Sequence, residues 1–338
     1  MVLHRRTVDE PVERSYCAPR CRAGAASLGV GVVTGAVLPQ PGGELFLTDS
    51  GLETDLIFHG GWDLPHFAAF PLLDDPRGRA ALREYFAAHV RVAEQAGRPV
   101  VLETPTWRAS ADWGDLLGRD AAELDRLNRD AVRLVQQVRD EHPSARVLVS
   151  GCIGPRGDGY RAGAMTAEQA QQYHAPQVRS LAAAGADLVT GMTLSTADEA
   201  VGLVLAASAA GVPVVVSFTV EVDGRLPDGS ALAEAVQAVD AATGAAAAYF
   251  MVNCAHPLHV WPALGEQVGD RLVGLRANAS RRSHAELDEA EVLDEGDPVE
   301  LARELLELRG AHPSLAVLGG CCGTDVRHIR ALAEAAAG

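Results

Sequence analysis

The strongest constraint on the fold of this chain is an alternation that repeats eight times from residue 44 onward. In each repeat a short apolar or β-branched run, typical of a buried strand, precedes a longer alanine- and leucine-rich run with helical spacing. We predict strands at 45–48, 99–103, 146–151, 187–191, 213–219, 248–253, 271–276 and 315–320. We predict helices at about 77–97, 120–141, 166–185, 196–211, 230–243, 257–268, 298–310 and 324–337.

Eight such repeats predict a single α/β domain, a (β/α)8 TIM barrel, over residues 44–338. A doubly wound open sheet would also alternate strands with helices, but the sequence has no dinucleotide-binding glycine fingerprint between a strand and a helix. Residues 1–43 are rich in arginine and small residues and show no strand or helix period. We expect them to form a disordered extension that is not a signal peptide.

The composition excludes several classes of function. A net charge of −16 argues against a nucleic-acid partner, because phosphate backbones require clustered positive charge. No apolar stretch approaches the ~20 residues of a membrane span, so we expect no membrane partner. All 29 basic residues are arginines, which excludes enzymes that need a lysine Schiff base. Six cysteines do not resemble a secreted disulfide framework, and we predict a cytoplasmic protein.

Three cysteines lie at the ends of predicted strands. Cys254 follows the sixth strand, and Cys321 and Cys322 follow Gly319-Gly320 at the end of the eighth. In a barrel the sixth and eighth strands flank the seventh, so their carboxyl ends lie within about 10 Å of each other. Three thiolates with an open fourth position predict a reactive zinc site, because a structural zinc would have four protein ligands.

Other interpretations of these residue types stay open. Cys321 and Cys322 could be a buried apolar pair or a disulfide between neighbours. Cys152, near the end of the third strand, could serve as a reserve ligand, although packing in the core fits it better. His256 and His259 lie at a predicted helix start, which favours capping or a surface role over metal binding.

Carboxylates also gather where predicted strands end, which is the place where barrel enzymes bind substrates. Asp49 follows the first strand and could either bind a substrate or hold its own loop through backbone hydrogen bonds. Glu53 lies in the same loop, and Glu103 ends the second strand. Each of these glutamates could contact a substrate or pair with an arginine.

Six motifs over residues 45–335 form a distinctive set. They are Thr48-Asp49-Ser50-Gly51-Leu52-Glu53-Thr54, Thr104-Pro105-Thr106-Trp107-Arg108-Ala109-Ser110, Gly154-Pro155, Ser217-Phe218-Thr219, Asn253-Cys254 and Gly319-Gly320-Cys321-Cys322-Gly323. Together they resemble the homocysteine S-methyltransferase family of zinc-dependent barrels. The resemblance implies that Zn2+ is bound by Cys254, Cys321 and Cys322. We expect no further catalytic group, and substrate contacts at Asp49, Gly51, Glu53, Thr54, Glu103, Met192, Thr193 and Asn253.

The resemblance also implies a reaction, the transfer of a methyl group to the thiol of homocysteine or a related thiol. The acceptor thiol would take the open zinc position, and zinc lowers the pKa of a bound thiol, so a thiolate forms without a base. The donor must already be activated, as in S-methylmethionine, S-adenosylmethionine or betaine. No cobalamin or folate module follows the barrel in this sequence, so we expect a small free donor. A homo-oligomer is compatible with the sequence.

One residue departs from the family pattern. In relatives the fourth strand ends in a Glu-Thr pair whose carboxylate holds the amino group of homocysteine, whereas this chain has Met192-Thr193. A thioether cannot neutralise an ammonium group. One hypothesis is that Glu53 takes over recognition of the amine. The other is that the acceptor is a different thiol or a selenol, with Met192 against an apolar group.

Two alternatives come from other functional classes. The barrel could be a non-catalytic relative that sequesters a thiol or serves as a subunit of a methyl-transfer assembly. It could also be a zinc hydrolase, because an open zinc position can activate water. Three thiolates disfavour hydrolysis because they reduce the Lewis acidity of zinc, and no histidine is placed as a base.

Overall fold

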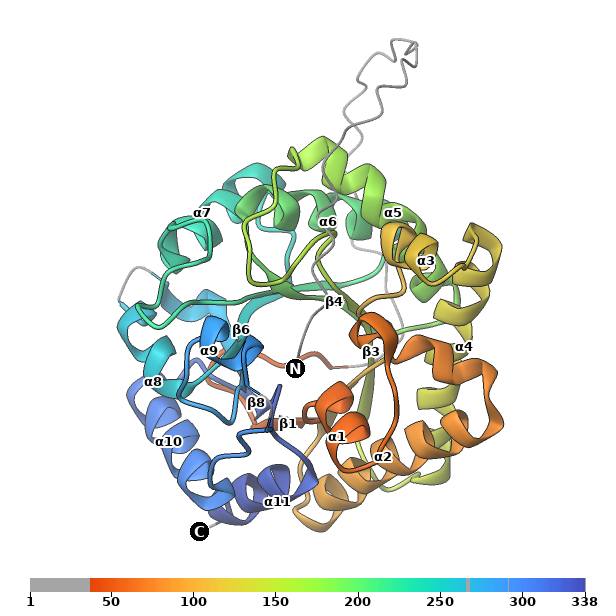
Figure 1. Ribbon diagram of the computed structural model, residues 1–338. Helices are drawn as coiled ribbons and strands as arrows, with labels where there is room; N and C mark the ends of the chain where they lie inside the picture. The colour runs from red at the N-terminus through yellow and green to blue at the C-terminus, as the bar shows by residue number, and fades with distance from the viewer. Residues whose placement is uncertain (1–36, 266–267, 291, 338) are drawn as a thin grey trace.

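The computed structural model describes residues 37–265, 268–290 and 292–337, which form a closed barrel of eight parallel strands (Figure 1). Residues 1–36 of the predicted extension lie outside the described residues. The predicted TIM barrel is confirmed, since each strand pairs with the next along the chain and the last pairs with the first. The strands are β1 (Phe46–Thr48), β2 (Val100–Glu103), β3 (Val147–Ile153), β4 (Leu188–Leu194), β5 (Val214–Phe218), β6 (Tyr249–Ala255), β7 (Leu272–Ala277) and β8 (Val317–Gly320).

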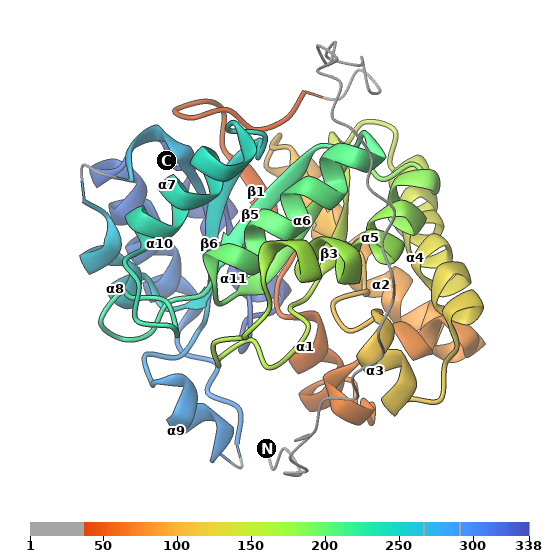
Figure 2. The same cartoon turned by 90° about the horizontal axis from the view of Figure 1, so that it is seen from above.

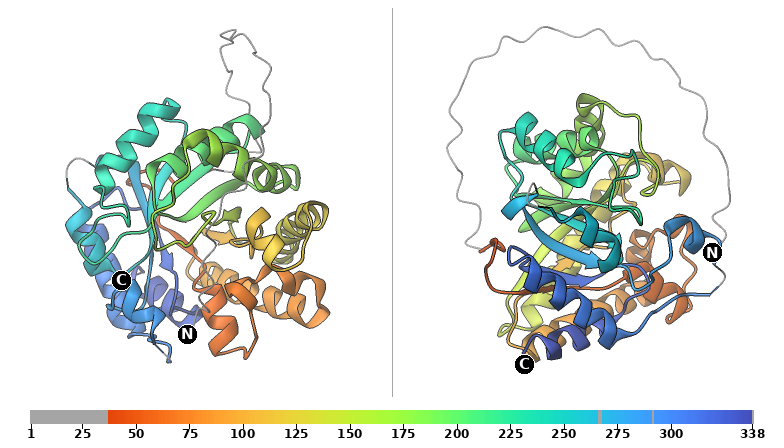
Figure 3. Two further views of the ribbon diagram at one scale, coloured as in Figure 1. Left: turned by 45° about the horizontal axis from the view of Figure 1, so that its top comes forward. Right: turned by 90° about the vertical axis from the view of Figure 1, so that its left-hand side faces the viewer.

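Helices surround the barrel on its outside (Figures 1 and 3). In the described part of the chain, the predicted helices match α2, α4, α5, α6, α7, α10 and α11 to within two residues at each end. The helices are α1 (Leu52–Phe58), α2 (Pro76–Gln95), α3 (Ala111–Leu116), α4 (Ala121–Glu141), α5 (Ala167–Ala183), α6 (Ala197–Ala210), α7 (Leu232–Thr243), α8 (Pro257–Val260), α9 (His284–Asp288), α10 (Pro298–Ala311) and α11 (Val326–Ala335).

The predicted helix at 257–268 is wrong for most of its length. After α8 the chain makes a single 3-10 turn over Trp261–Ala263. Pro262 has no N–H to donate to the helical ladder, so the regular helix stops there. The short helices α1, α3 and α9 are absent from the prediction, because seven residues or fewer carry too little periodicity to be recognised.

Capping side chains fix where the long helices begin. At the start of α4, Asp120 accepts hydrogen bonds from the backbone N–H of Glu123, and the Glu123 carboxylate accepts from the N–H of Asp120. Thr166 and Gln169 form the same reciprocal pair at the start of α5. Each capping box satisfies backbone donors that the helix leaves free, and therefore sets the length of the loop before it.

The half of the barrel interior nearest the start of the strands is a packed core. One cluster of buried side chains fills it, contributed by Phe46, Val101, Leu148, Leu188, Val215, Tyr249, Met251, Val273 and Val317. The interior therefore offers no channel, and polar chemistry is confined to the end where the strands finish. Among the described residues, no helix has the length and hydrophobicity needed to span a membrane.

The loops at the carboxyl ends of the strands are built up by short helices. α1 follows β1, α3 follows β2 and α9 follows β7, and Figure 2 shows the three helices at the same end of the barrel. All of the predicted metal and substrate residues lie on these strand ends or in the segments that follow them. The fold therefore brings residues far apart in the sequence to one end of the molecule.

Candidate metal and substrate site

The three predicted cysteine ligands meet in space. The sulfur atoms of Cys254, Cys321 and Cys322 all lie within 4.8 Å of one another. They meet because β6 and β8 both pair with β7, as the sequence predicted. Cys254 and Cys321 are joined by a disulfide with their Cα atoms 5.3 Å apart, whereas the Cys322 sulfur is free and lies 3.8 Å from that of Cys254. The alternative of a disulfide between neighbouring cysteines is therefore not what forms.

An unusual backbone conformation aims Cys254 at the other two cysteines. Its φ is +55°, in the left-handed region that non-glycine residues seldom adopt. The register of β6 against β7 shifts between Asn253 and Ala255, so the strand bulges at this point. The Nε2 of His284 donates a hydrogen bond of 2.7 Å to the Cys254 carbonyl and helps to hold the bulge. Such strain persists where the surrounding structure fixes it, as at many functional sites.

Close backbone approach explains the glycines of the site. A Cβ added to Gly51 would collide with the carbonyl oxygen of Cys321 and with Thr54. Thr54 Oγ1 donates to the Gly51 carbonyl at 2.9 Å and accepts from the N–H of Gly323 at 3.2 Å. The loop after β1 is therefore bound directly to the turn that carries Cys321 and Cys322.

Asn253 connects the cysteine cluster to the neighbouring strand ends. Its side-chain oxygen accepts hydrogen bonds from the Thr193 N–H at 2.8 Å and from Ser217 Oγ at 2.7 Å. Its Nδ2 donates to Thr193 Oγ1 at 2.8 Å and points to the Cys321 sulfur at 3.8 Å. Thr193 has a φ of +62°, so a second strand end is strained here. Asn253 and Thr193 thus hold each other and Cys321, and their predicted contact with a substrate stays a prediction.

Met192 lies where the family pattern expects a carboxylate. Its side chain is buried, and its backbone carbonyl accepts a hydrogen bond of 3.4 Å from Trp107 Nε1. The β4 end of the site therefore presents an apolar thioether, as the sequence indicated.

The carboxylate of Asp49 lies between β2 and β7. One oxygen accepts a hydrogen bond of 3.1 Å from the backbone N–H of Glu103, and the other lies 2.5 Å from Nη2 of Arg276. Arg276 also donates to the carbonyls of Ser50 and Gly320, each at 3.1 Å. Asp49 therefore holds a loop, as one of the two sequence interpretations had it, and also neutralises a buried arginine.

Two glutamates stand beside this ion pair. Burial is the main reason that the pKa of Glu103 rises to about 7, with Arg276 opposing the rise and Asp49 adding to it. Burial likewise raises the pKa of Glu53 to about 7. Glu53 is half-buried, and its charge acts on Cys322. Neither glutamate forms an ion pair with an arginine within 4.0 Å in the described part of the chain.

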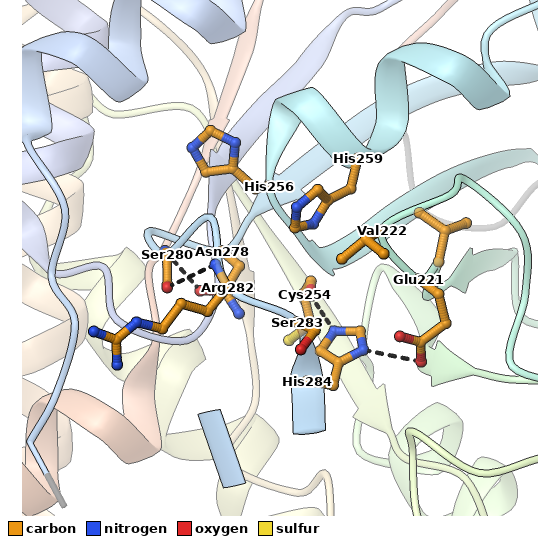
Figure 4. Close-up of a pocket in the computed structure, with 11 residues that line it drawn as sticks. Glu221, Val222, Cys254, His256, His259, Asn278, Ser280, Arg282, Ser283 and His284 are labelled. Carbon is orange, nitrogen blue, oxygen red and sulfur yellow. Dashed lines mark hydrogen bonds and ion pairs between the residues drawn. The ribbon is translucent and has the colours of Figure 1, made fainter. Parts of the chain in front are cut away.

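A small pocket is lined in part by Cys254, His256 and His259 (Figure 4). His256 caps α8 by accepting from the N–H of Leu258 at 3.3 Å, and it lies 3.3 Å from Glu304. His259 donates to a backbone carbonyl of Arg281 at 3.1 Å. The capping role predicted for His256 is confirmed, and neither histidine belongs to either of the two groups of described residues that could hold a metal ion.

Cys152 also lies outside both groups. Its thiol is free and buried, and burial raises its pKa well above the ordinary value. The interpretation of Cys152 as a packing residue therefore fits better than that of a reserve ligand.

Three residues at this end of the barrel were missed by sequence reasoning. Arg276 is the one charged residue in the otherwise apolar strand β7, and a charge at such a position could have been recognised in the sequence as a candidate functional residue. His284 is the first residue of α9 and Tyr160 lies in the loop after β3, and their rings stack with centroids 4.1 Å apart. Nothing in the sequence indicates that these two segments meet beside Cys254.

Comparison with known proteins now identifies the family. The family model described as homocysteine S-methyltransferase matches residues 48–336. The chain belongs to the homocysteine S-methyltransferase family. The resemblance seen in the sequence is thereby confirmed, and this member of the family is a methyltransferase, as predicted. The alternatives of a non-catalytic barrel and of a zinc hydrolase receive no support.

Solved structures of Escherichia coli homocysteine methyltransferase MmuM share the fold of this family member. The oxidized form matches with a TM-score of 0.70 and 24% identity, over 86% of this chain and 96% of that one. The metallated form gives the same score and identity over 87% and 96%. The apo form gives 0.64 and 24% over 88% and 96%. The comparison with curated proteins gives no match.

The raised pKa of Glu103 predicts a pH-dependent cost in stability. Unfolded, this carboxyl loses its proton near pH 4.5, whereas folded it keeps the proton until about pH 7. The folded state binds more protons between these values, so the contribution of Glu103 to stability falls as the pH rises through this window. We expect Glu103→Gln to raise the free energy of unfolding at pH 8 by ~1–3 kcal/mol, with most of the gain lost at pH 5.

Urea unfolding of the reduced, metal-free protein at both pH values measures this effect. The same difference between variant and wild type at pH 5 and at pH 8 would show that Glu103 titrates normally.

Proposed function

We propose that this chain transfers a methyl group from a small activated donor to the thiol of homocysteine, using a zinc ion held by Cys254, Cys321 and Cys322. The observation that carries the proposal is the meeting of these three sulfur atoms within 4.8 Å at the carboxyl end of the barrel. Zinc binds thiolates strongly, and three protein ligands leave the fourth tetrahedral position for a substrate. Bound zinc would lower the pKa of an acceptor thiol and keep it as a thiolate near neutral pH.

The spacing of the sulfurs fits a tetrahedral zinc. Zinc–sulfur bonds of about 2.3 Å place two sulfur ligands about 3.8 Å apart. Cys254 and Cys322 already have their sulfurs 3.8 Å apart. Cys321 is held in the disulfide with Cys254, so this bond must be reduced before three thiolates are available. The relative from Escherichia coli has likewise been solved in an oxidized form and in a metallated form.

The residues around the cysteines position and shield the reacting groups. The side-chain amide N–H of Asn253 points to the Cys321 sulfur and not to the sulfurs of Cys254 and Cys322. Gly51 and Thr54 hold the turn that carries Cys321 and Cys322 in place. An acceptor bound at the cysteines would therefore contact a rigid backbone on that side. The half-buried Glu53 carries negative charge when ionised, which favours the cationic sulfonium and ammonium groups of activated donors.

The test is a methyl-transfer assay with reduced, zinc-loaded protein. Homocysteine and methyl-labelled S-methylmethionine are supplied, S-adenosylmethionine and betaine are tested in parallel, and labelled methionine is detected by mass spectrometry. We expect labelled methionine from the wild type with one of these donors, and none from Cys321→Ser or from protein kept oxidised. Protein that holds zinc and yields no labelled product with any donor would contradict the proposal.

A further inference from the structure

The buried polar atoms without a hydrogen-bond partner include two on oppositely charged side chains at the mouth of the barrel. They are Oε2 of Glu103 and Nη1 of Arg276. Both residues are only 6% exposed. A buried polar or charged group without a partner is costly, so native proteins seldom keep two in one place unless a ligand or water completes them.

The two orphan groups belong to one region because Asp49 links them. The same carboxylate accepts from the backbone N–H of Glu103 and pairs with the guanidinium of Arg276. Among the described residues, the Glu103 carboxylate forms no ion pair within 4.0 Å with that guanidinium, although each charge acts on the pKa of the other. Oε2 of Glu103 and Nη1 of Arg276 therefore do not satisfy each other, and one buried acceptor and one buried donor are left without a partner.

The neighbours of Glu103 on β3 and β4 are already hydrogen-bonded or apolar. Ser150 and Thr190 form hydrogen bonds to the Glu103 side chain and to each other, the latter at 2.7 Å. They fix the carboxylate in place. On β4 the next inward position is Met192, which can neither donate a strong hydrogen bond nor accept one. An ammonium group entering here would find a buried, unpaired acceptor in Oε2 of Glu103.

We propose that Glu103 and Arg276 together recognise the amino-acid part of the acceptor. The Glu103 carboxylate accepts hydrogen bonds from the α-ammonium group, and Nη1 of Arg276 donates to the α-carboxylate. Asp49 acts as a positioning residue that holds Arg276 and the β2 end. The inference rests on the proposed function, because it assumes that the acceptor thiol binds at the cysteine cluster.

This assignment explains how the chain can bind an amino-acid thiol without a carboxylate on β4. It also differs from the hypothesis that Glu53 recognises the amine. Glu53 is half-buried beside Cys322 and has no buried unpaired oxygen, whereas Glu103 has one. The Glu53→Gln variant is therefore the matched comparison for Glu103→Gln, since each removes one carboxylate of similar pKa from the same mouth.

Calorimetric binding to reduced, zinc-loaded protein tests the inference with three thiols. Homocysteine carries both groups, 4-mercaptobutanoate lacks the amine, and 3-mercaptopropan-1-amine lacks the carboxylate. We expect Glu103→Gln to weaken homocysteine and the aminothiol by ~10–100-fold and to leave 4-mercaptobutanoate unchanged within about twofold. We expect Arg276→Lys, which keeps a charge beside Asp49, to weaken the two carboxylate-bearing thiols and spare the aminothiol.

Several outcomes would overturn the inference. Glu103→Gln could bind homocysteine as tightly as wild type does, or could lose affinity for all three thiols equally. Glu53→Gln could also lose as much affinity for the amine-bearing thiols as Glu103→Gln does, or more. Wild-type protein that binds the three thiols with equal affinity would remove the inference and leave the proposed function standing. Wild-type protein that holds zinc and binds none of the thiols would remove both. Zinc content and thermal unfolding of each variant show that the comparison is between folded, loaded proteins.

Discussion

Replacing Cys322 with serine should abolish stable metal binding and reduce methyl transfer by about a thousandfold, which corresponds to ~4 kcal/mol of transition-state stabilisation. Cys322 is the free sulfur of the cluster and lies 3.8 Å from that of Cys254. A serine hydroxyl remains protonated near neutral pH and is a poor ligand for zinc, so two thiolates would have to hold the ion. Metal analysis of the purified, reduced variant and a methyl-transfer assay measure the two effects.

Cys152→Ser is the matched control for this prediction. Cys152 is another free cysteine at the carboxyl end of a strand, but it lies outside the cluster of Cys254, Cys321 and Cys322. It should keep about one zinc per chain and most of the activity. Equal loss of metal in Cys152→Ser and Cys322→Ser would show that any change in this end of the barrel disrupts the site, and would remove the specific role of Cys322.

Gly51→Ala should destabilise the protein by ~1–3 kcal/mol and weaken its hold on the metal. The added methyl group would collide with the Cys321 carbonyl and with Thr54, so the loop after β1 and the cysteine turn must move apart. Because that carbonyl belongs to a predicted ligand, the displacement reaches the metal site directly. Thermal unfolding and competition with a zinc chelator measure the change in stability and in metal affinity.

Gly310→Ala provides the control for the glycine substitution. Gly310 is exposed near the end of α10, and a Cβ there meets nothing within 4 Å. Alanine is the better helix former, so this variant should be slightly more stable and should bind metal as wild type does. If Gly51→Ala behaved in the same way, the contact with Cys321 would not constrain the site.

The barrel could be predicted from the sequence because its strands and long helices are strongly periodic. Val147–Ile153 and Ala121–Glu141 show the two patterns clearly, and each element lies next to its sequence neighbour. The convergence of Cys254 with Cys321 followed from topology alone, because any closed barrel places its sixth and eighth strands beside the seventh. No side-chain detail was needed for that step.

The rest of the site depends on contacts that no local pattern encodes. The positive φ values of Thr193 and Cys254 arise from bulges in β4 and β6, which change the direction of the side chains at the strand ends. The pairing of Asp49 with Arg276 joins the ends of β1 and β7 across the barrel mouth. Such a pairing depends on which inward positions face each other in the barrel. Because Arg276 pairs with Asp49, the charge of Asp49 is neutralised and Glu103 is left without a full set of hydrogen-bond partners.

X-ray absorption spectroscopy at the zinc edge, with and without homocysteine, examines the proposed centre most directly. We expect three sulfur neighbours at about 2.3 Å and one lighter neighbour in reduced, zinc-loaded protein. Adding homocysteine should replace the lighter neighbour with a fourth sulfur. A zinc surrounded mainly by nitrogen or oxygen, or one whose three sulfurs and lighter neighbour stay unchanged at saturating homocysteine, would contradict thiol activation at Cys254, Cys321 and Cys322.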